Sequence, residues 1–172
     1  STTKLYTVDD VRNMPDDGNR YETIDGELFV TPAPGWRHQA ALRELTYLLT
    51  GYVKLFGLGV LLFAPFDILL GPLTLVEPDI LFVRDARRDR FTERELTAAP
   101  DLAVEVLSPN TARTDRGRKR ALYQSAGVAE YWIVDLEHRQ VEVWRPGALE
   151  ASVHRDRLTW QPEPAAEPLV IE

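Results

Sequence analysis

The sequence predicts an α/β (α+β) fold in which a central mixed β-sheet is flanked by helices, with a β-hairpin near the N-terminus. Apolar segments of strand length are grouped between two main helical segments, and this grouping is typical of a mixed sheet. The chain has 172 residues, about the size of one domain, and can bury a core without disulfides. Its 44% apolar and 27% charged residues are ordinary for a globular protein. We therefore expect a single domain over residues 1–172.

The first part of the chain predicts a short helix followed by a hairpin. Thr7 has an acidic residue, Asp10, three positions later, which is the pattern of a capping box. Asp25-Gly26 separates two segments of strand character, and this dipeptide is a strong signal for a two-residue hairpin loop. The expected elements are a helix at residues 7–11 and strands at residues 21–24 and 27–30.

The middle of the chain predicts one long helix and then several strands. From Trp36 to Phe56 the apolar residues recur with a period of 3.6, as in an amphipathic helix. Glycines follow it, and apolar segments of strand length come next. We expect strands at residues 59–63, 66–70 and 76–83. The charged residues 84–95 predict a solvated loop or a short helix.

Residues 100–135 read as a strand, a polar turn, a cationic helix and a second strand. The helix is expected to begin near Thr111 or Ala112. A further strand is expected at residues 140–145, exposed at the sheet edge near 141–144, with one or two edge strands within residues 151–160. Residues 161–172 are rich in Pro, Glu and Ala, which predicts an extended tail.

Composition and charge exclude several classes of protein. The chain has no cysteine, which excludes disulfides and thiolate metal sites. Its longest apolar runs are too short to span a bilayer, and it begins with no signal-peptide pattern, so we expect a cytoplasmic protein that does not bind membranes. The formal net charge of −7 argues against a surface that binds nucleic acid everywhere. Residues 113–120 nevertheless hold five cations and one acid, so a local basic cleft is possible.

Two carboxylates fall in or next to strands and could meet at one edge of the sheet. Glu105 interrupts the apolar run of residues 102–107, and Asp79 follows Pro78 in the preceding strand segment. Two neighbouring carboxylates repel each other unless a proton or a divalent cation lies between them. Oxygen ligands of this kind suit Mg²⁺ or Mn²⁺. The alternative is that Asp79 caps a turn and Glu105 pairs with an arginine of the next helix.

The cationic helix and the first turn of the long helix supply further candidates. Asp115 and Lys119 are four residues apart and fall near one helix face, where one of the cations could reach Glu105. A surface pair between Asp115 and Lys119 is the alternative. His38 and Glu27 could point at the same sheet edge and supply a ligand or a proton carrier. The alternative for His38 is a surface or capping residue.

Several motifs together resemble the Uma-type endonuclease family, a branch of the PD-(D/E)XK nuclease superfamily. The central match is Glu77-Pro78-Asp79-Ile80 followed by residues 100–109, PDLAVEVLSP. It continues through Thr114-Asp115-Arg116-Gly117, Lys119 and Tyr123 to residues 127–135, GVAEYWIVD. Upstream, Tyr21-Glu22, residues 25–28 (DGEL) and His38 also match. The resemblance covers nearly the whole chain.

The resemblance implies a restriction endonuclease-like core and Mg²⁺-dependent hydrolysis of phosphodiester bonds. Asp79 and Glu105 match the two acidic positions of the motif and would bind Mg²⁺ or Mn²⁺ together with the backbone carbonyl of Val106. The usual lysine position, two residues after Glu105, is Leu107 in this sequence. The resemblance therefore places the catalytic lysine at Lys119, on the following helix. It makes Glu27, His38 and Asp115 accessory site residues.

The function that follows is a metal-dependent nuclease, most directly one acting on DNA, that works as a homodimer. In this interpretation four arginines of the cationic helix contact nucleic acid: Arg113, Arg116, Arg118 and Arg120. The net charge and the missing lysine at position 107 leave an alternative, a catalytically weak or inactive binding or assembly module on the same fold. A third possibility is hydrolysis of a small phosphodiester, which an acidic surface would tolerate better.

Overall fold

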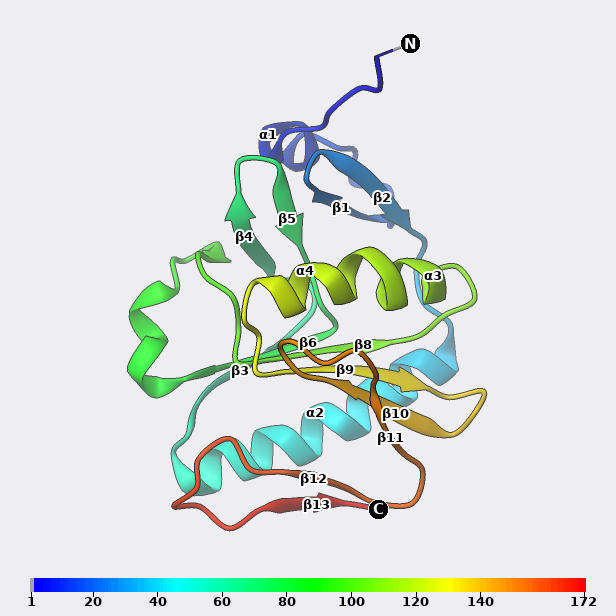
Figure 1. Cartoon of the computed structure of the whole chain (residues 1–172). Helices are drawn as coiled ribbons and strands as arrows, with labels where there is room; N and C mark the ends of the chain where they lie inside the picture. Colours follow the sequence, from blue (N-terminus) through cyan, green and yellow to red (C-terminus); the bar gives the residue numbers. More distant parts are fainter. Residues whose placement is uncertain (1) are drawn as a thin grey trace.

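The structure is a computed structural model that describes residues 2–172, and it consists of two mixed sheets with helices packed against them (Figure 1). The larger sheet has six strands in the order β11-β10-β9-β8-β6-β3. Only β8 and β9 are parallel; the other neighbours are antiparallel. The predicted α/β (α+β) fold with a central mixed sheet is therefore confirmed. The bounds of these strands are β3 (Gly59–Phe63), β6 (Ile80–Arg84), β8 (Leu102–Val106), β9 (Glu130–Asp135), β10 (Gln140–Trp144) and β11 (Ser152–His154).

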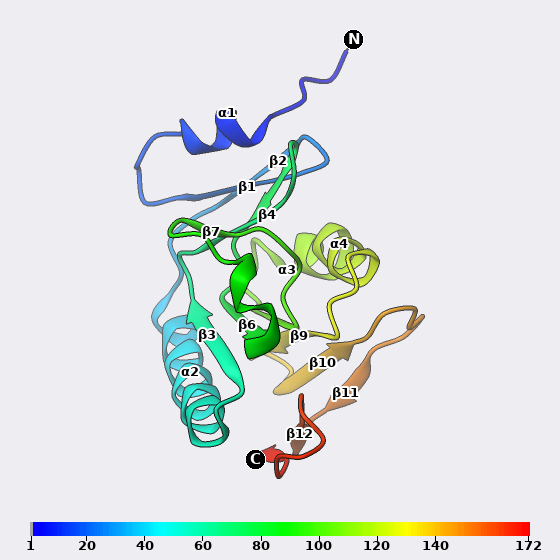
Figure 2. The ribbon, with the colours of Figure 1, turned by 90° about the vertical axis from the view of Figure 1, so that its left-hand side faces the viewer.

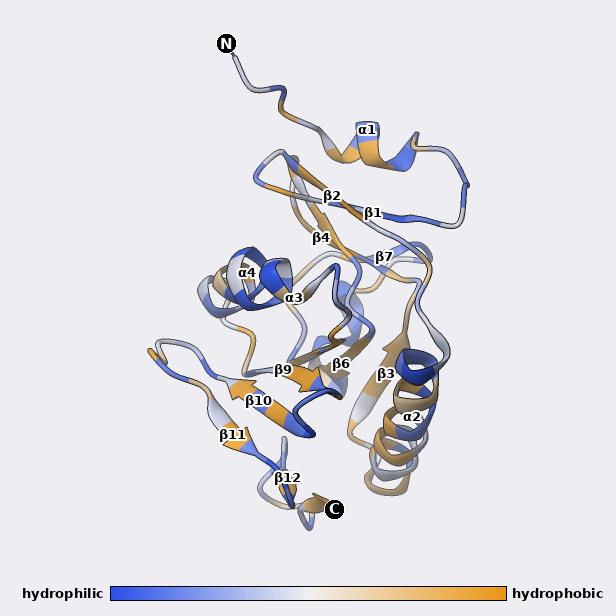
Figure 3. Ribbon diagram, turned by 90° about the vertical axis from the view of Figure 1, so that its right-hand side faces the viewer, coloured by the Kyte–Doolittle hydropathy of each residue, from blue (hydrophilic) through white to orange (hydrophobic). Residues whose placement is uncertain are grey.

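Both faces of the six-stranded sheet are covered, and the side chains of each strand alternate between them. Ile80 and Phe82 contribute to the cluster that packs against α2 (Trp36–Phe56), whereas Leu81 and Val83 contribute to the cluster on the opposite face. Figures 1 and 2 show α2 and the α3–α4 segment on opposite faces, and Figure 3 shows the hydrophobic residues along β9 and β10. This alternation puts Glu105 on the α3–α4 face, together with Ala103.

The smaller sheet has five strands in the order β2-β1-β5-β4-β7, and it begins with the predicted hairpin. The hairpin pairs Ile24 with Glu27 across the Asp25-Gly26 loop, as expected. The predicted capping box of α1 (Val8–Arg12) is also present, with Thr7 and Asp10 exchanging hydrogen bonds. The bounds of these strands are β1 (Arg20–Ile24), β2 (Glu27–Thr31), β4 (Asp67–Gly71), β5 (Thr74–Val76) and β7 (Glu95–Leu96).

The single strand expected at residues 76–83 is two strands in the structure, and this correction matters for the site. β5 ends at Val76 and β6 begins at Ile80, so the Glu77-Pro78-Asp79 segment crosses from one sheet to the other. Proline lacks the N–H that a ladder needs, which favours a break at this point. The crossing places Asp79 where the two sheets meet.

The helices agree with the sequence except in the cationic segment. The α2 helix spans Trp36–Phe56 as predicted and ends at Gly57, whose φ of 61° is left-handed. The cationic helix starts at Ala112 as expected but has three parts: α3 (Ala112–Thr114), a π-helical turn η2 (Asp115–Lys119) and α4 (Arg120–Ser125). The charged segment after β6 contains the 3₁₀ helix η1 (Asp85–Arg90).

The C-terminal part closes one edge of the larger sheet. The prediction of an exposed sheet edge near residues 141–144 is wrong, because β11 pairs with β10 from Val141 to Val143. The outer strand is therefore β11. The tail includes β13 (Leu169–Ile171), which pairs with β12 (Leu158–Trp160) beside α2 (Figure 1). No helix within residues 2–172 has the length and apolar character needed to cross a membrane.

Candidate active site

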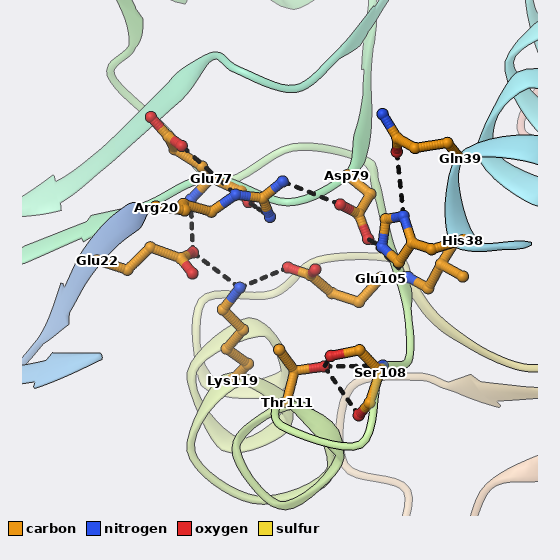
Figure 4. A network of polar contacts seen from close by, with 11 residues as sticks. Arg20, Glu22, His38, Gln39, Glu77, Asp79, Glu105, Ser108, Thr111 and Lys119 are labelled. Carbon is orange, nitrogen blue, oxygen red and sulfur yellow. Dashed lines mark hydrogen bonds and ion pairs between the residues drawn. The ribbon is translucent and has the colours of Figure 1, made fainter. Parts of the chain in front are cut away.

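A cavity of about 720 Å³ lies where the two sheets meet, and it collects most of the residues singled out from the sequence. Its walls come from β1, the start of α2, the crossing between β5 and β6, the end of β8 and the segment from Ser108 to Lys119. Figure 4 shows the polar network at its centre. The expected residues that line it are Asp79, Glu105, Val106, Lys119, His38 and Asp115.

Asp79 is held by donors on three sides. Its Oδ2 accepts a hydrogen bond from the backbone N–H of Val106 at 2.7 Å, and its Oδ1 accepts one from Nη2 of Arg20 at 3.1 Å. His38 Nε2 is 3.3 Å from Oδ2 (Figure 4). Burial opposes ionisation of Asp79, but the hydrogen bond from His38 and the charge of Arg20 outweigh it, so its pKa lies below the usual value. Asp79 is therefore an ionised carboxylate in the cavity.

Lys119 lies between two buried carboxylates. Its Nζ is 2.7 Å from Oε1 of Glu105 and 2.7 Å from Oε2 of Glu22, and all three side chains are at most 3% exposed. Burial opposes the ammonium charge, yet Glu105 and Glu22 raise the pKa of Lys119 well above its ordinary value. Burial also raises the pKa of Glu105, against the attraction of Lys119. Among Glu22, Glu105 and Lys119, the ammonium of Lys119 therefore stays charged.

The π-helical turn carries both Asp115 and Lys119 into the cavity wall. Both residues are buried although they lie among arginines. The hydroxyl of Tyr131 donates to the carbonyl of Asp115 at 2.9 Å, which stabilises the widened turn from the sheet side. Turns of this type often occur at functional sites. Ser108 and Thr111 bond to each other at the entrance of the segment, with Ser108 N donating to Thr111 Oγ1 at 3.1 Å.

Asp115 is buried and only partly satisfied. Its Oδ2 has no hydrogen-bond partner among residues 2–172. Burial raises the pKa of Asp115 to about 6, although the charge of Lys119 opposes this. Since buried polar atoms are nearly always paired, this oxygen is available to a water molecule or a ligand.

Several charged cavity residues were not singled out from the sequence as site residues, among them Arg20, Glu77 and Asp67. Arg20 donates to the carbonyl of Glu77 at 2.8 Å as well as to Asp79. Glu22, although part of the matched motif, was also not predicted to bond Lys119. Several of their contacts join residues more than 50 positions apart, such as the Glu22 carboxylate and the N–H of Glu77. The sequence signals were the charged residues at alternating positions of the first hairpin strand and the presence of Glu22 and Glu77 in the matched motif.

The raised pKa of Glu77 gives a stability prediction. Burial, followed by the hydrogen bond and charge of Asp67, raises the pKa of Glu77 to about 8. Between pH ~4.5 and this value the folded chain binds a proton that the unfolded chain has released, so raising the pH lowers the free energy of unfolding. The slope is at most about 1.4 kcal/mol per pH unit. We expect Glu77→Gln to lose this slope.

Urea unfolding in EDTA across this pH window measures the effect. Glu44→Gln is the control, because Glu44 is exposed on α2. Parallel stability curves for wild type and Glu77→Gln would contradict the prediction.

The structure places Glu27 and the four arginines outside the cavity wall. Glu27 stands at the loop end of the hairpin, is exposed, and lies 3.2 Å from Nε of Arg118, so the structure does not bring it to the cavity. Arg116 binds Asp135 at 2.7 Å and Glu142 at 2.6 Å. Arg120 donates to Gln124 at 2.8 Å and stacks over Trp144. Arg113 is exposed and forms no ion pair within residues 2–172.

The donor set of the cavity fits a hard divalent cation. Seven acidic side chains outnumber the three Arg and Lys side chains of its lining, which are Arg12 and the two central cations, Arg20 and Lys119. The acids are Asp16, Glu22, Asp67, Glu77, Asp79, Glu105 and Asp115. No three His, Cys, Asp or Glu side chains within residues 2–172 surround one point as metal ligands, because these two cations lie between the carboxylates. Mg²⁺ commonly takes one or two carboxylates and completes its shell with water and phosphate oxygens. Asp79 and Glu105 supply two carboxylates to the cavity lining.

Comparisons with known proteins agree with this fold. A family profile described as "Uma2: Putative restriction endonuclease" matches residues 8–171. The structure is similar to the crystal structure of "a putative nuclease belonging to DUF820 from Anabaena variabilis ATCC 29413", with a TM-score of 0.74. The two chains are 24% identical, and the match covers 88% of this chain and 85% of that chain. A search of curated proteins gives no match.

Proposed function

Because the chain belongs to the Uma2 family, we propose that it is a metal-dependent nuclease that hydrolyses phosphodiester bonds in DNA. The observation that carries this proposal is the meeting of Asp79, Glu105 and Lys119 in one cavity. Asp79 comes from the crossing between the sheets, Glu105 from the middle of the larger sheet and Lys119 from the helical segment above it. Three distant segments thus supply two carboxylates and an ammonium.

The position of Lys119 supports the proposed role of a displaced catalytic lysine. Leu107 stands where the superfamily motif has its lysine, and it is partly buried against the α3–α4 side. Lys119 reaches the carboxylate of Glu105 from the helical segment on this same face, at 2.7 Å. An ammonium at this point can orient a water molecule and stabilise negative charge on a phosphoryl group.

Each cavity residue has a distinct role in this proposal. Asp79, Glu105 and the carbonyl of Val106 would hold Mg²⁺ or Mn²⁺. The N–H of Val106 faces Asp79, and the N–H and C=O of one strand residue point to the same edge, so this carbonyl also faces that side. The bound metal would supply Lewis acidity and a more acidic water. His38 and Arg20 keep Asp79 ionised and oriented.

Removal of the metal tests the proposal. The wild-type protein should cleave plasmid or single-stranded DNA with Mg²⁺ or Mn²⁺ and lose this activity in excess EDTA. Activity should return when the metal is restored. Cleavage that is indifferent to EDTA would refute metal dependence. A panel that includes RNA and small phosphodiesters identifies the substrate class.

The alternative is a weakly active or inactive binding or assembly module on the same fold. The net charge of −7 and the internal pairing of Arg116 favour it. In that case calorimetry would show Mg²⁺ binding that depends on Glu105, without cleavage of any substrate.

We also propose that the protein forms a homodimer in which the outer strand β11 pairs with β11 of a second copy. Sedimentation that shows a monomer at micromolar concentration would contradict this proposal.

A further inference from the structure

Trp36 is a large aromatic side chain that stands in solvent and is next in sequence to residues that line the cavity. It is the first residue of α2 and is 75% exposed. The residues just before it, Pro34 and Gly35, line the cavity, and so do His38 and Gln39 just after it. The guanidinium of Arg37 lies 5.6 Å from the centre of the indole ring. An exposed aromatic ring with an adjacent cation therefore lies in the helical turn that supplies part of the cavity wall.

Stability of the fold does not account for this placement. Trp132 and Trp160 are 0% and 3% exposed and belong to the core, where burial of their area stabilises the fold. Trp36 leaves most of its area in water. A single exposed aromatic residue is ordinary on a protein surface. Trp36 is of interest because it adjoins cavity residues in the sequence and because the cation of Arg37 lies beside its ring.

The rim carries cations that the protein does not neutralise. Arg37 and Arg113 are exposed, and neither forms an ion pair within the part of the chain that the structure describes. Arg37 adjoins the wall formed by the start of α2. Arg113 follows the opposite wall, formed by residues 108–111. Figure 4 shows these two walls, with His38 and Gln39 on one and Ser108 and Thr111 on the other, and Asp79 and Glu105 between them.

We propose that the cavity takes single-stranded nucleic acid, with one base stacked on Trp36 and flanking phosphates beside Arg37 and Arg113. This inference rests on the proposed nuclease function and names its substrate class. Exposed aromatic side chains bind single strands by stacking on the free face of a base. The cavity volume of about 720 Å³ lies within the range of pockets that enclose small ligands.

Charge and base accessibility both favour a single strand over a duplex. A duplex carries twice the charge per length of one strand, and a chain of net charge −7 with two free rim cations offers little to neutralise it. In a duplex, each base is stacked on its neighbours, so its face reaches an indole only after the base is flipped out. A single strand meets the Trp36 ring at no such cost.

Binding in EDTA tests the inference without cleavage. The probe is a short fluorescently labelled DNA strand of mixed sequence, compared with the same strand annealed to its complement. We expect the single strand to bind more tightly than the duplex. Trp36→Ala should weaken single-strand binding by about 5- to 160-fold, the effect of losing one stacked base. Trp36→Phe, which keeps an aromatic face, should recover most of the affinity.

Tyr47→Ala is the matched control. Tyr47 is an equally exposed aromatic residue on the same helix, 75% exposed, but it lies about 16 Å further along the helix axis. Its replacement should leave binding unchanged. The logarithm of the binding constant should fall linearly with the logarithm of the salt concentration. Two phosphate contacts, at Arg37 and Arg113, predict a slope of about −1.4. Arg37→Gln should halve that slope.

The outcomes separate this inference from the proposed function. Equal binding by wild type and Trp36→Ala, or tighter binding of the duplex, would overturn the inference even if Mg²⁺-dependent cleavage is observed. Single-strand binding that requires Trp36, in a protein that cleaves nothing, would support the inference and overturn the nuclease proposal.

Discussion

Glu105→Gln is expected to reduce Mg²⁺-dependent cleavage by at least about 100-fold. Mutation of residues that only hydrogen-bond to a metal ligand already lowers metal affinity or activity by about 10- to 100-fold, and loss of a ligand itself should cost more. Glutamine keeps the size of the side chain and one oxygen for Lys119 but removes the charge that would hold the metal. Since Glu105 is buried and its pKa is raised, the neutral variant should fold. Cleavage rates and Mg²⁺ affinity by calorimetry should fall together.

Glu142→Gln is the control for this substitution. Glu142 is also a buried glutamate of the larger sheet, 8% exposed and paired with a cation, Arg116. It lies outside the cavity lining. Its replacement should leave metal affinity and cleavage unchanged. Cleavage by Glu105→Gln at the wild-type rate would remove Glu105 from the chemistry.

Lys119→Met is expected to lower the free energy of unfolding at pH 7 by about 3–5 kcal/mol, because it leaves two buried carboxylates without their cation. The affected groups are Glu22 and Glu105, both 2.7 Å from Nζ. The loss should shrink as the pH falls, since protonation then neutralises Glu105, whose pKa is raised by burial. Urea unfolding at neutral and mildly acidic pH measures both effects.

The double variant Lys119→Met with Glu22→Gln separates stability from catalysis. It removes one positive and one negative charge, so the net charge of the buried group returns to its wild-type value. Stability should recover in part, and the two substitutions should be non-additive because the residues are in contact. Cleavage should stay lost, because no ammonium faces Glu105. Recovery of cleavage in the double variant would mean that Lys119 acts only through stability.

Local signals in the sequence predicted most of the elements. The Asp25-Gly26 dipeptide and its flanking residues determine a hairpin within a few positions, and the period of the apolar residues determines the α2 helix over its full length. These signals depend on neighbours within one turn or one loop, so they can be read without the rest of the chain. The same reasoning failed at residues 76–83, where the apolar character of the segment hid the crossing between two sheets.

Only part of the site was predicted, because the sequence does not show which distant residues come into contact. The family motif indicated Asp79, Glu105 and Lys119, which the structure brings to one cavity. It did not distinguish Glu22 from Glu27, which stand on paired strands of the same hairpin. Glu22 bonds Lys119, whereas Glu27 lies two pairs nearer the loop and pairs with Arg118 in solvent. Only the packing of the hairpin against the α3–α4 segment decides which acid is buried.

The sequence by itself determined most of the elements, the family and the two acidic positions of the motif, because periodicity, turn residues and motif spacing are local properties of the chain. The tertiary structure alone decided the electrostatics of the cavity. Arg20 meets Asp79 across 59 positions and Lys119 meets Glu22 across 97, and such contacts depend on strand register and on how two sheets pack. A buried charge takes its pKa and its role from those distant partners, so neither could be read from its neighbours in the chain.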